Sequence, residues 1–264
     1  MILAIDVGNS RVHFGCFNDS GKLVASEVMA HNDLRELISR RRFGVKDLSS
    51  FGATEPYRSA NTTYKSAVNV AVMASTCPRM DKSVVKLVRR LFGIGVIKIG
   101  KDLSVPIANR TINSSMVGQD RLLNALAAYR RTKTQTLVID VGTAITIDVV
   151  SKKGEFVGGV IAPGLNVMAQ ALYQNCEKLP LIRMDKIVSV IGNNTESAMA
   201  SGVFFSVVGL INEVVKRISS RLKSKPKIII TGGDAVILNP YLADKCIFVP
   251  NLTLEGIYLV SAGL

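Results

Sequence analysis

Hydrophobic and polar positions follow the same order in two separate stretches of the chain. Residues 2–28 read ILAIDVGNSRVHFGCFNDSGKLVASEV, and residues 136–161 read TLVIDVGTAITIDVVSKKGEFVGGVI. In both, an apolar run ends in Asp-Val-Gly, a second β-branched run follows, and a polar turn containing glycine leads into a third apolar run. Runs of Val, Ile and Thr that are interrupted by glycine turns favour strands joined in hairpins. Each stretch therefore predicts a three-stranded antiparallel meander, and the repeat indicates two related halves.

The pattern changes to alternating helices and strands after each meander. Apolar residues at helical spacing predict helices at Asn32–Arg42, Lys82–Phe92, Asp120–Arg131 and most of Thr195–Leu222. Short apolar runs predict further strands at Val68–Ala74, Gly95–Ile99 and Lys227–Ile230. Strands that alternate with helices are typical of an α/β fold. We therefore expect two α/β domains, residues 1–114 and 115–264, that face each other across a central cleft, with the boundary in the irregular stretch Asn109–Ser115.

Composition limits the class of protein and raises a question about its partners. The chain has 264 residues, 48% of them hydrophobic, so it can bury a large core and is neither disordered nor a disulfide-rich miniprotein. Its 33 Lys and Arg exceed its 20 Asp and Glu, which gives a formal charge of +13. Such a charge suggests nucleic acid, a membrane surface or an anionic small substrate. However, Trp is absent and aromatic residues are few, which is unlike single-strand nucleic-acid binders. A source with generally basic proteins explains the charge slightly better.

Cysteines and apolar runs indicate the compartment. Cys16, Cys77, Cys176 and Cys246 are widely dispersed, and with only two histidines in the chain no closely spaced zinc set can form. Scattered thiols are typical of a reducing compartment. The amino-terminal run meets Asp6 and has no preceding basic segment, which is unlike a signal peptide. No uninterrupted apolar run approaches the roughly 20 residues that span a bilayer. We expect a cytoplasmic protein without a membrane segment.

The two Asp-Val-Gly turns are suited to phosphate chemistry. The backbone amides and small hydroxyls of Gly8-Asn9-Ser10 and Gly142-Thr143 can surround phosphate oxygens, because glycine permits close backbone approach. A carboxylate needs a cation between itself and a phosphate, so Asp6 and Asp140 are candidates to bind Mg²⁺ or a monovalent ion. A single such motif would be interpreted as an ordinary strand-ending turn. Two in matching positions favour a nucleotide site.

Eight short motifs occur in order along nearly the whole chain. They are DVGNS (6–10), ASTCP (74–78), GQDR (118–121), DVGTAITID (140–148), GGVIAPGL (158–165), GNNT (192–195), TGG (231–233) and NLTLEG (251–256). Each alone is weak, but the ordered set resembles type III pantothenate kinase. This family belongs to the superfamily of acetate and sugar kinases, heat-shock chaperones and actin. The resemblance implies two duplicated ribonuclease H-like domains and ATP-dependent phosphorylation of pantothenate to 4′-phosphopantothenate, the first step of coenzyme A biosynthesis.

The resemblance also implies roles for the GQDR motif. Asp120 corresponds to the general base that takes the proton of the pantothenate hydroxyl. It starts a predicted helix, where the helix dipole favours the ionised carboxylate, and Arg121 suits the substrate carboxylate or a phosphoryl oxygen. The implied pantothenate site consists of Gly118, Gln119, Asp120, Arg121 and Thr195, the last supplied by the neighbouring subunit of a homodimer. A helix N-cap is the plain structural alternative for Thr195.

The nucleotide and cation sites are implied in the same way. The implied ATP-binding residues are Asp6, Val7, Gly8, Asn9, Ser10, Arg11, Val12, His13 and Thr143. Asp6 would assist Mg²⁺, and Asp140 corresponds to the ligand of a monovalent cation, K⁺ or NH₄⁺. The turn at 231–233 would lie against the nucleotide, although ordinary turn chemistry explains it equally well. Pro163-Gly164 can be a strand-ending turn and nothing more.

Two departures from the family pattern keep alternatives open. Ser10 stands where the family commonly has Thr, which is a mild change. Thr111 and Ser114 stand where it often has a Tyr that lines the pantothenate pocket and a Pro. A second interpretation is therefore a kinase of the same superfamily that acts on another hydroxyl substrate. A third is a regulatory nucleic-acid-binding protein, motivated by the charge of +13. We rank it last, because a binder has no need of Asp6, Asp120 and Asp140 together.

Overall fold

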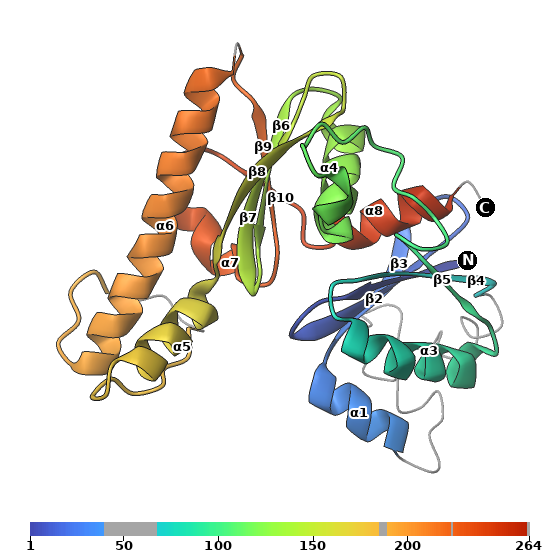
Figure 1. Ribbon diagram of the computed structural model, residues 1–264, viewed down its shortest axis with the longest axis horizontal. Helices are drawn as coiled ribbons and strands as arrows, with labels where there is room; N and C mark the ends of the chain where they lie inside the picture. Colours follow the sequence, from blue (N-terminus) through green and yellow to red (C-terminus); the bar gives the residue numbers. More distant parts are fainter. Residues whose placement is uncertain (40–67, 185–188, 223, 263–264) are drawn as a thin grey trace. The chain divides into compact units, whose positions relative to one another are not determined.

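The computed structural model of the protein describes residues 1–39, 68–184, 189–222 and 224–262 (Figure 1). The chain forms two compact units. The first comprises Met1–Pro106, Ser115–Ala127 and Leu252–Leu264, and the second comprises Ile107–Ser114 and Ala128–Asn251. Segments far apart in the sequence thus pack into one unit. The division into domains 1–114 and 115–264 stays a prediction.

The first unit contains a five-stranded sheet of order β3-β2-β1-β4-β5. Its strands are β1 (Ile2–Val7), β2 (Arg11–Phe17), β3 (Leu23–Ala30), β4 (Val70–Ser75) and β5 (Val96–Lys98). The first three strands pair antiparallel, which confirms the predicted meander, whereas β4 and β5 continue the sheet parallel to β1. The predicted strands at 68–74 and 95–99 are confirmed, with ends shifted by one or two residues.

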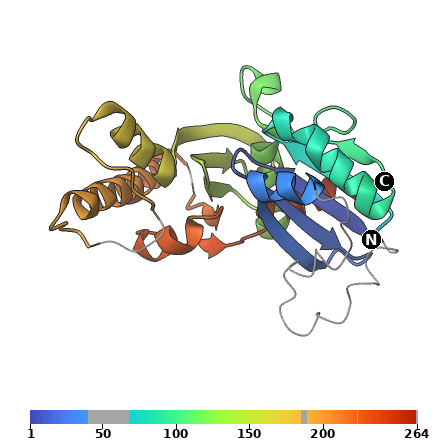
Figure 2. The ribbon, with the colours of Figure 1, turned by 90° about the horizontal axis from the view of Figure 1, so that it is seen from below.

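Alternating side chains of β1 serve two different cores. Leu3, Ile5 and Val7 pack against α1 (His31–Ser39) and α3 (Pro78–Phe92), which lie side by side on one face (Figures 1 and 2). Ala4 points to the opposite face, where Leu123 of α4 (Gln119–Thr132) and Leu254 of α8 (Leu252–Ser261) cover it. Because side chains alternate along a strand, Asp6 lies on this second face together with Ala4.

The second unit repeats the same sheet. Its order is β10-β9-β6-β7-β8, with β6 (Thr136–Val141), β7 (Ala144–Val150), β8 (Phe156–Pro163), β9 (Lys227–Thr231) and β10 (Ile247–Phe248). The antiparallel meander β6-β7-β8 is confirmed, and β9 pairs parallel with β6 as β4 does with β1. Two helices, α5 (Leu165–Asn175) and α6 (Thr195–Arg221), pack on the face that carries Leu137, Ile139 and Val141 (Figure 1). Short helical turns are η2 (Ser114–Met116), α7 (Ala235–Leu238) and η3 (Asn239–Tyr241).

The predicted helices are present with adjusted ends. Helix α3 begins at Pro78 rather than Lys82, because Cys77 takes the N-cap position and proline suits the first turn. Of the predicted helix Asn32–Arg42, the part up to Ser39 is helical, and residues 40–42 lie outside the described part of the chain. Helices α5 and α8 and strand β10 have no counterpart among the predicted elements.

Helix α6 has an apolar composition that needs a structural explanation. In the described part of the chain, it alone is long and apolar enough to cross a membrane. Its buried residues, which include Val203, Phe204 and Val207, pack into the core of the second unit. A helix that covers a sheet carries apolar residues on the face that it buries. Burial in this core therefore accounts for the apolar residues on that face of α6.

Candidate functional site

Asp6 lies near the carboxyl end of β1, in the middle of the first sheet. It is directly opposite His13 of β2 and Ala74 of β4. Directly opposed residues point to the same face of a sheet, so Asp6 and His13 share the face that α4 and α8 cover. Burial, and next the charge of Arg11, lower the pKa of His13 below its usual range. The shift favours the neutral form of the His13 imidazole.

The turn after Asp6 is a short hairpin with an exposed tip. The Gly8 amide donates to the Arg11 carbonyl at 3.0 Å, and the tip residues Asn9 and Ser10 are exposed. The Nε2 atom of His31 lies 3.0 Å from the Gly8 carbonyl oxygen and donates to it. A Cβ atom at position 8 would lie 3.2 Å from the Arg11 carbonyl, so glycine suits this position. The turn is therefore a small polar loop that joins the carboxyl end of β1 to β2.

Two members of the predicted nucleotide loop can contribute only through their backbone. Val7 and Val12 are paired across the hairpin and are fully buried in the core against α1 and α3. Their side chains support the loop from beneath. Contacts of Val7 and Val12 with a nucleotide would therefore come from backbone atoms, whereas Asn9, Ser10 and Arg11 have exposed side chains.

Asp120 lies in the first turn of α4, near the same carboxyl ends of the first sheet's parallel strands as Asp6. The side chain of Gln119 packs over Gly100, at 3.1 Å from where a Cβ atom would be. Gly100 follows β5, and β5 runs parallel to β4 and β1, so α4 begins at the edge where these strands end. Leu123 lies one turn beyond Asp120 and packs with Ala4. Asp6 and Asp120 thus lie on the same face of the sheet, near the carboxyl ends of its parallel strands.

The environment of Asp120 makes it a stronger base than an ordinary aspartate, so the expectation that its place at the helix start would favour the ionised form is wrong. Burial raises the pKa of Asp120, and this effect exceeds the lowering by the Arg121 backbone amide and the Arg121 charge. Desolvation disfavours a carboxylate, which therefore holds a proton more readily. A Cβ atom at Gly118 would collide with the Asp120 carboxylate, so glycine leaves the space that this carboxylate occupies. The motif GQDR is thereby explained at three of its four positions.

Asp140 of the second unit occupies the position that Asp6 occupies in the first. It lies opposite Thr146 of β7 and Thr231 of β9. Gly232 follows with a positive φ of 97°, and a Cβ atom there would lie 2.6 Å from Oδ1 of Asp140. The TGG turn therefore packs directly on the Asp140 carboxylate, and any side chain at position 232 would displace it.

The hairpin after Asp140 is tied to the start of α5. The Gly142 amide donates to the Ala144 carbonyl at 3.1 Å, and the Gly164 amide donates to the Thr143 carbonyl at 3.0 Å. A Cβ atom at Gly164 would collide with the backbone oxygens of Gly142 and Thr143. Pro163-Gly164 is thus more than a strand-ending turn, because it brings the α5 N-terminus against the hairpin. Thr143 itself is exposed at the tip.

Asp148 is a buried acid that the sequence prediction assigned no role. Its exposed fraction is 1%, and it accepts a hydrogen bond from Thr146 Oγ1 at 3.2 Å. Gly159, directly opposite on β8, leaves space for the carboxylate, since a Cβ atom there would lie 2.5 Å from Oδ1. Asp148 shares its sheet face with Asp140. Asp148 is the second aspartate of the motif DVGTAITID, and this position in the motif was the sequence signal that could have singled it out.

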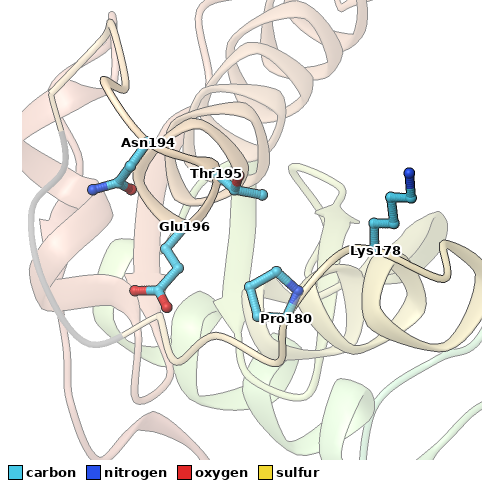
Figure 3. Close-up of a pocket in the computed structure, with 5 residues that line it drawn as sticks. All are labelled: Lys178, Pro180, Asn194, Thr195 and Glu196. Atoms are coloured by element: carbon cyan, nitrogen blue, oxygen red, sulfur yellow. The ribbon is translucent and has the colours of Figure 1, made fainter.

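Thr195 begins α6 in the second unit but does not cap it. The cap is Asn194, whose side chain accepts from the Ser197 amide at 2.8 Å while Ser197 Oγ accepts from the Asn194 amide at 3.1 Å. The alternative reading of Thr195 as the N-cap is therefore wrong. Thr195 is exposed and lines an open cavity of about 550 Å³ (Figure 3). The other lining residues are Lys178, Pro180, Asn194 and Glu196.

Comparison with known proteins decides between the possible classes. A model of the family described as type III pantothenate kinase matches residues 2–217. A protein named type III pantothenate kinase from Persephonella marina is 34% identical over 258 residues, which cover 98% of this chain and 97% of the relative. One of the same name from Citrifermentans bemidjiense is 33% identical over 98% of both chains. The chain belongs to the type III pantothenate kinase family.

Solved structures agree with the fold expected for this family. A candidate 2-dehydro-3-deoxygalactonokinase from Sinorhizobium meliloti matches with a TM-score of 0.59 at 9% identity, over 100% of this chain and 99% of the other. A conserved Campylobacter jejuni protein, a candidate Baf family transcriptional activator, matches with a TM-score of 0.58 at 19% identity, over 98% and 96%. At such identities the likeness concerns the fold alone. The two sheets of equal strand order confirm the predicted α/β class and are consistent with duplicated ribonuclease H-like domains.

The acidic residues offer oxygen ligands to a cation, although the described residues form no side-chain cage. Within the described ranges, no group of three or more His, Cys, Asp or Glu side chains converges on one point. Mg²⁺ in kinases is bound by one or two carboxylates with phosphate oxygens and water, so Asp6 suffices as a protein ligand. Asp140 lies beside the backbone oxygen of Val141 around Gly232. Carboxylate and carbonyl oxygens suit hard cations.

The segment with the two family departures is held against β8 of the second unit. Arg110 forms an ion pair with Glu155 at 2.6 Å, and its amide donates to the Phe156 carbonyl at 2.9 Å. Asn109 Oδ1 accepts from Thr111 Oγ1 at 2.8 Å, and Asn109 Nδ2 donates to the Ser114 carbonyl at 3.1 Å. Thr111 and Ser114 thus take part in a local hydrogen-bonded turn in place of the Tyr and Pro that are frequent in the family.

Proposed function

We propose that this type III pantothenate kinase uses Asp120 as the general base, the hairpin Asp6–His13 as the ATP-phosphate loop and Asp140 as a cation ligand. Family membership makes the chain an ATP-dependent kinase that phosphorylates pantothenate in coenzyme A biosynthesis. The observation that supports the residue roles is the common location of Asp6 and Asp120. Both acids lie on one face of the first sheet, near the carboxyl ends of its parallel strands.

Asp120 is suited to take the proton of the pantothenate hydroxyl. A primary hydroxyl is a weak nucleophile and must lose its proton as the γ-phosphoryl group is transferred. The pKa of Asp120 is raised by burial, which brings the base closer to the operating pH and strengthens it. Gly118 and Gln119 would shape the substrate site around the carboxylate. Arg121, beside it, would bind the substrate carboxylate or a phosphoryl oxygen.

The ATP phosphates would lie on the first hairpin. The exposed Asn9, Ser10 and Arg11 offer an amide, a hydroxyl and a guanidinium to anionic oxygens, and Gly8 allows close approach. Asp6 would hold Mg²⁺, which supplies neutralisation of the charge that develops on the transferred phosphoryl group. We propose Thr143, whose side chain is exposed, as a further ATP contact, and Asp140 as the ligand of K⁺ or NH₄⁺.

Assembly and location are proposals as well. Thr195 would reach pantothenate in the neighbouring subunit of a homodimer, which its exposure at the start of α6 allows. Exposed apolar side chains in the same region, Leu181, Val190 and Ile191, are suited to burial in an interface. A cytoplasmic location agrees with the four free cysteines among the described residues.

Turnover by the purified protein tests the proposed roles. With ATP, Mg²⁺ and pantothenate, the wild-type chain should transfer phosphate, and Asp120→Asn should lower kcat by about 100-fold or more while ATP binding persists. Asp33→Asn is a matched control, because Asp33 is an exposed acid in the first turn of α1. Near-normal kcat in Asp120→Asn would show that the base is another group.

A second candidate function follows from the turn around Thr111. Because Thr111 is engaged with Asn109 and presents no aromatic ring, we propose as a second candidate that the pocket prefers another hydroxyl substrate, such as a sugar, over pantothenate. A coupled assay that compares pantothenate with sugars separates the two. Turnover of pantothenate at least as fast as that of any sugar excludes this alternative. Faster turnover of a sugar would contradict pantothenate as the substrate.

A further inference from the structure

Two side chains of the first unit, those of Ser75 and Lys98, meet at Asp81 in the first turn of α3. Oδ1 of Asp81 accepts from Ser75 Oγ at 2.6 Å, and Oδ2 accepts from Lys98 Nζ at 3.0 Å. The side chains of Asp81 and Lys98 are 17% and 32% exposed, so water screens this ion pair only in part. These residues join the ends of β4 and β5 to the start of α3. We refer to Ser75, Asp81 and Lys98 as the Asp81 cluster.

The Asp81 cluster shapes the turn that carries Thr76. Ser75 Oγ accepts from the Cys77 amide at 3.2 Å, so its two hydrogen bonds close the turn from Ser75 to Cys77. Between them, Thr76 donates twice to one atom, the carbonyl oxygen of Val7. Its amide lies 2.9 Å and its Oγ1 lies 3.3 Å from that oxygen. The turn is thus connected to the last residue of β1.

Val7 immediately precedes the hairpin that we propose binds ATP. The hairpin is closed by the bond from the Gly8 amide to the Arg11 carbonyl, and its tip is exposed. Two carbonyls at its base are held from outside: that of Val7 by Thr76 and that of Gly8 by His31. Groups that bind phosphate are most effective when their direction is set before the ligand arrives.

The Asp81 cluster lies on the other face of the sheet from Asp6. Ser75 is directly opposite Val7, whose side chain packs into the core with α1 and α3. Asp6 and Ala74 form the preceding pair, which points to the α4 side. The carboxylate of Asp81 is engaged by Ser75 and Lys98 on the α3 side. Any effect of Asp81 on a bound nucleotide would therefore pass through the backbone of the hairpin rather than through direct contact.

We propose that Asp81 is a positioning residue for the ATP-phosphate hairpin, acting through Ser75 and the Thr76–Val7 hydrogen bonds. This inference rests on the proposed function of the hairpin. It assigns a role to the motif ASTCP at 74–78, which the implied catalytic and binding sites left without one. It also predicts that the effect is specific for the nucleotide, because the substrate residues around Asp120 belong to α4.

Nucleotide binding and kinetics test this role. In Asp81→Asn and in Ser75→Ala, we expect the Kd of a non-hydrolysable ATP analogue with Mg²⁺ and the KM for ATP to rise about tenfold, with the KM for pantothenate within about twofold. The double variant should be no more than about twofold worse than Ser75→Ala, because both changes break one connection. Ser75→Thr keeps the hydroxyl and should restore near-normal values. Asp33→Asn, an exposed acid in the first turn of α1, is the control and should not change them.

Amide hydrogen exchange separates this inference from the proposed ATP site. Without nucleotide, Asp81→Asn should speed exchange at Gly8 and neighbouring amides while leaving the second hairpin, Gly142–Ala144, unchanged. This readout holds even if the wild-type chain fails to bind the ATP analogue, a result that would contradict the nucleotide site. Unchanged exchange at Gly8 with unchanged ATP affinity would overturn the positioning role. Equal changes in both KM values and at both hairpins would overturn it too, because they would show a general loss of structure.

Discussion

The hairpin after Asp6 is one residue longer than the hairpin after Asp140, although the two sheets have the same strand order. In the first unit Val7 pairs with Val12, whereas in the second Val141 pairs with Ile145. The first loop therefore has two tip residues, Asn9 and Ser10, and the second has only Thr143. A loop with two exposed tip residues offers more groups to a phosphate chain than a loop with one.

The strands beside the two aspartates differ as well. Asp6 is flanked by His13 and Ala74, and Asp140 is flanked by two threonines. Thr231 is buried, and the turn that follows it packs on the Asp140 carboxylate. The duplicated sheets thus place two carboxylates at equivalent positions, while the loops give them different surroundings. This difference is the reason to test the two proposed roles separately: phosphate and Mg²⁺ at Asp6, and a monovalent cation at Asp140.

The largest effect expected from the comparison of the two hairpins comes from removing the aspartate of each hairpin in turn. Asp140→Ala should abolish the response of the rate to K⁺ and raise the KM for ATP about tenfold, because the proposed cation ligand is lost. Asp6→Ala should instead raise the Mg²⁺ concentration needed for activity and retain a response to K⁺. Rates measured across K⁺ and Mg²⁺ titrations check both. Loss of the K⁺ response in both variants alike would contradict the separation of roles.

A smaller effect is expected from filling the glycines beside the two aspartates. Gly232→Ala should lower the free energy of unfolding by about 2 kcal/mol, because φ is positive and the Cβ atom would meet the Val141 backbone and the Asp140 carboxylate. Gly8→Ala should cost less, about 1 kcal/mol, since its Cβ atom would lie 3.2 Å from the Arg11 carbonyl. Urea denaturation measures both.

A control for these substitutions lies in α6. Gly202 is exposed, and a Cβ atom there has no neighbour within 4 Å, so Gly202→Ala should raise the free energy of unfolding by about 0.5–1 kcal/mol. A larger loss for Gly8→Ala than for Gly232→Ala would reverse the comparison. It would mean that the first hairpin is the more tightly enclosed of the two.

The smallest expected effect concerns the stability of the Asp120→Asn variant. Because the pKa of Asp120 is raised in the folded chain, the ionised carboxylate is less favourable there than in the unfolded chain. Removing the charge should therefore raise the Tm slightly at neutral pH, by roughly 2 °C. The gain should shrink as pH falls through the raised pKa, where wild-type Asp120 takes up its proton. Over the same range kcat/KM of the wild type should fall.

Thermal unfolding at several pH values measures this effect. Asp33→Asn removes an exposed carboxylate and serves as the control, for which no comparable gain at neutral pH is expected. A lower Tm for Asp120→Asn at neutral pH would indicate that the ionised carboxylate stabilises the fold. Burial would then not be raising the pKa of Asp120, and the proposed base would be no stronger than an ordinary aspartate.

Strands and hairpins were predictable because their signals are local. The alternation in residues 2–28 and 136–161 identified both meanders, and the repeated Asp-Val-Gly placed Asp6 and Asp140 at equivalent positions. Helix α8 could not be found in this way, because its sequence LTLEGIYLVS is apolar on most sides and has no clear amphipathic period. Helix α5 was not predicted either, because Pro163-Gly164 just before it was interpreted as a strand-ending turn.

The site shows the same limit. The motif GQDR made Asp120 the candidate base, but nothing in its sequence neighbours indicated that burial would raise its pKa. In the Asp81 cluster, Ser75 and Asp81 are six residues apart in the sequence, and Lys98 comes from another strand. Such a meeting depends on how β4, α3 and β5 pack, and no spacing in the sequence reveals it.

The sequence by itself determined the α/β class, the duplicated meanders and the identities of the acidic residues, because alternation, glycine turns and short motifs act between near neighbours. The tertiary structure decided where α4 lies and what surrounds Asp120. Thr253 of α8 donates to the buried Asn124 of α4 at 2.8 Å, and Gly256 lets α8 approach the Leu123 carbonyl. These contacts join residues more than a hundred positions apart, so they arise only when the folded chain brings the two helices together.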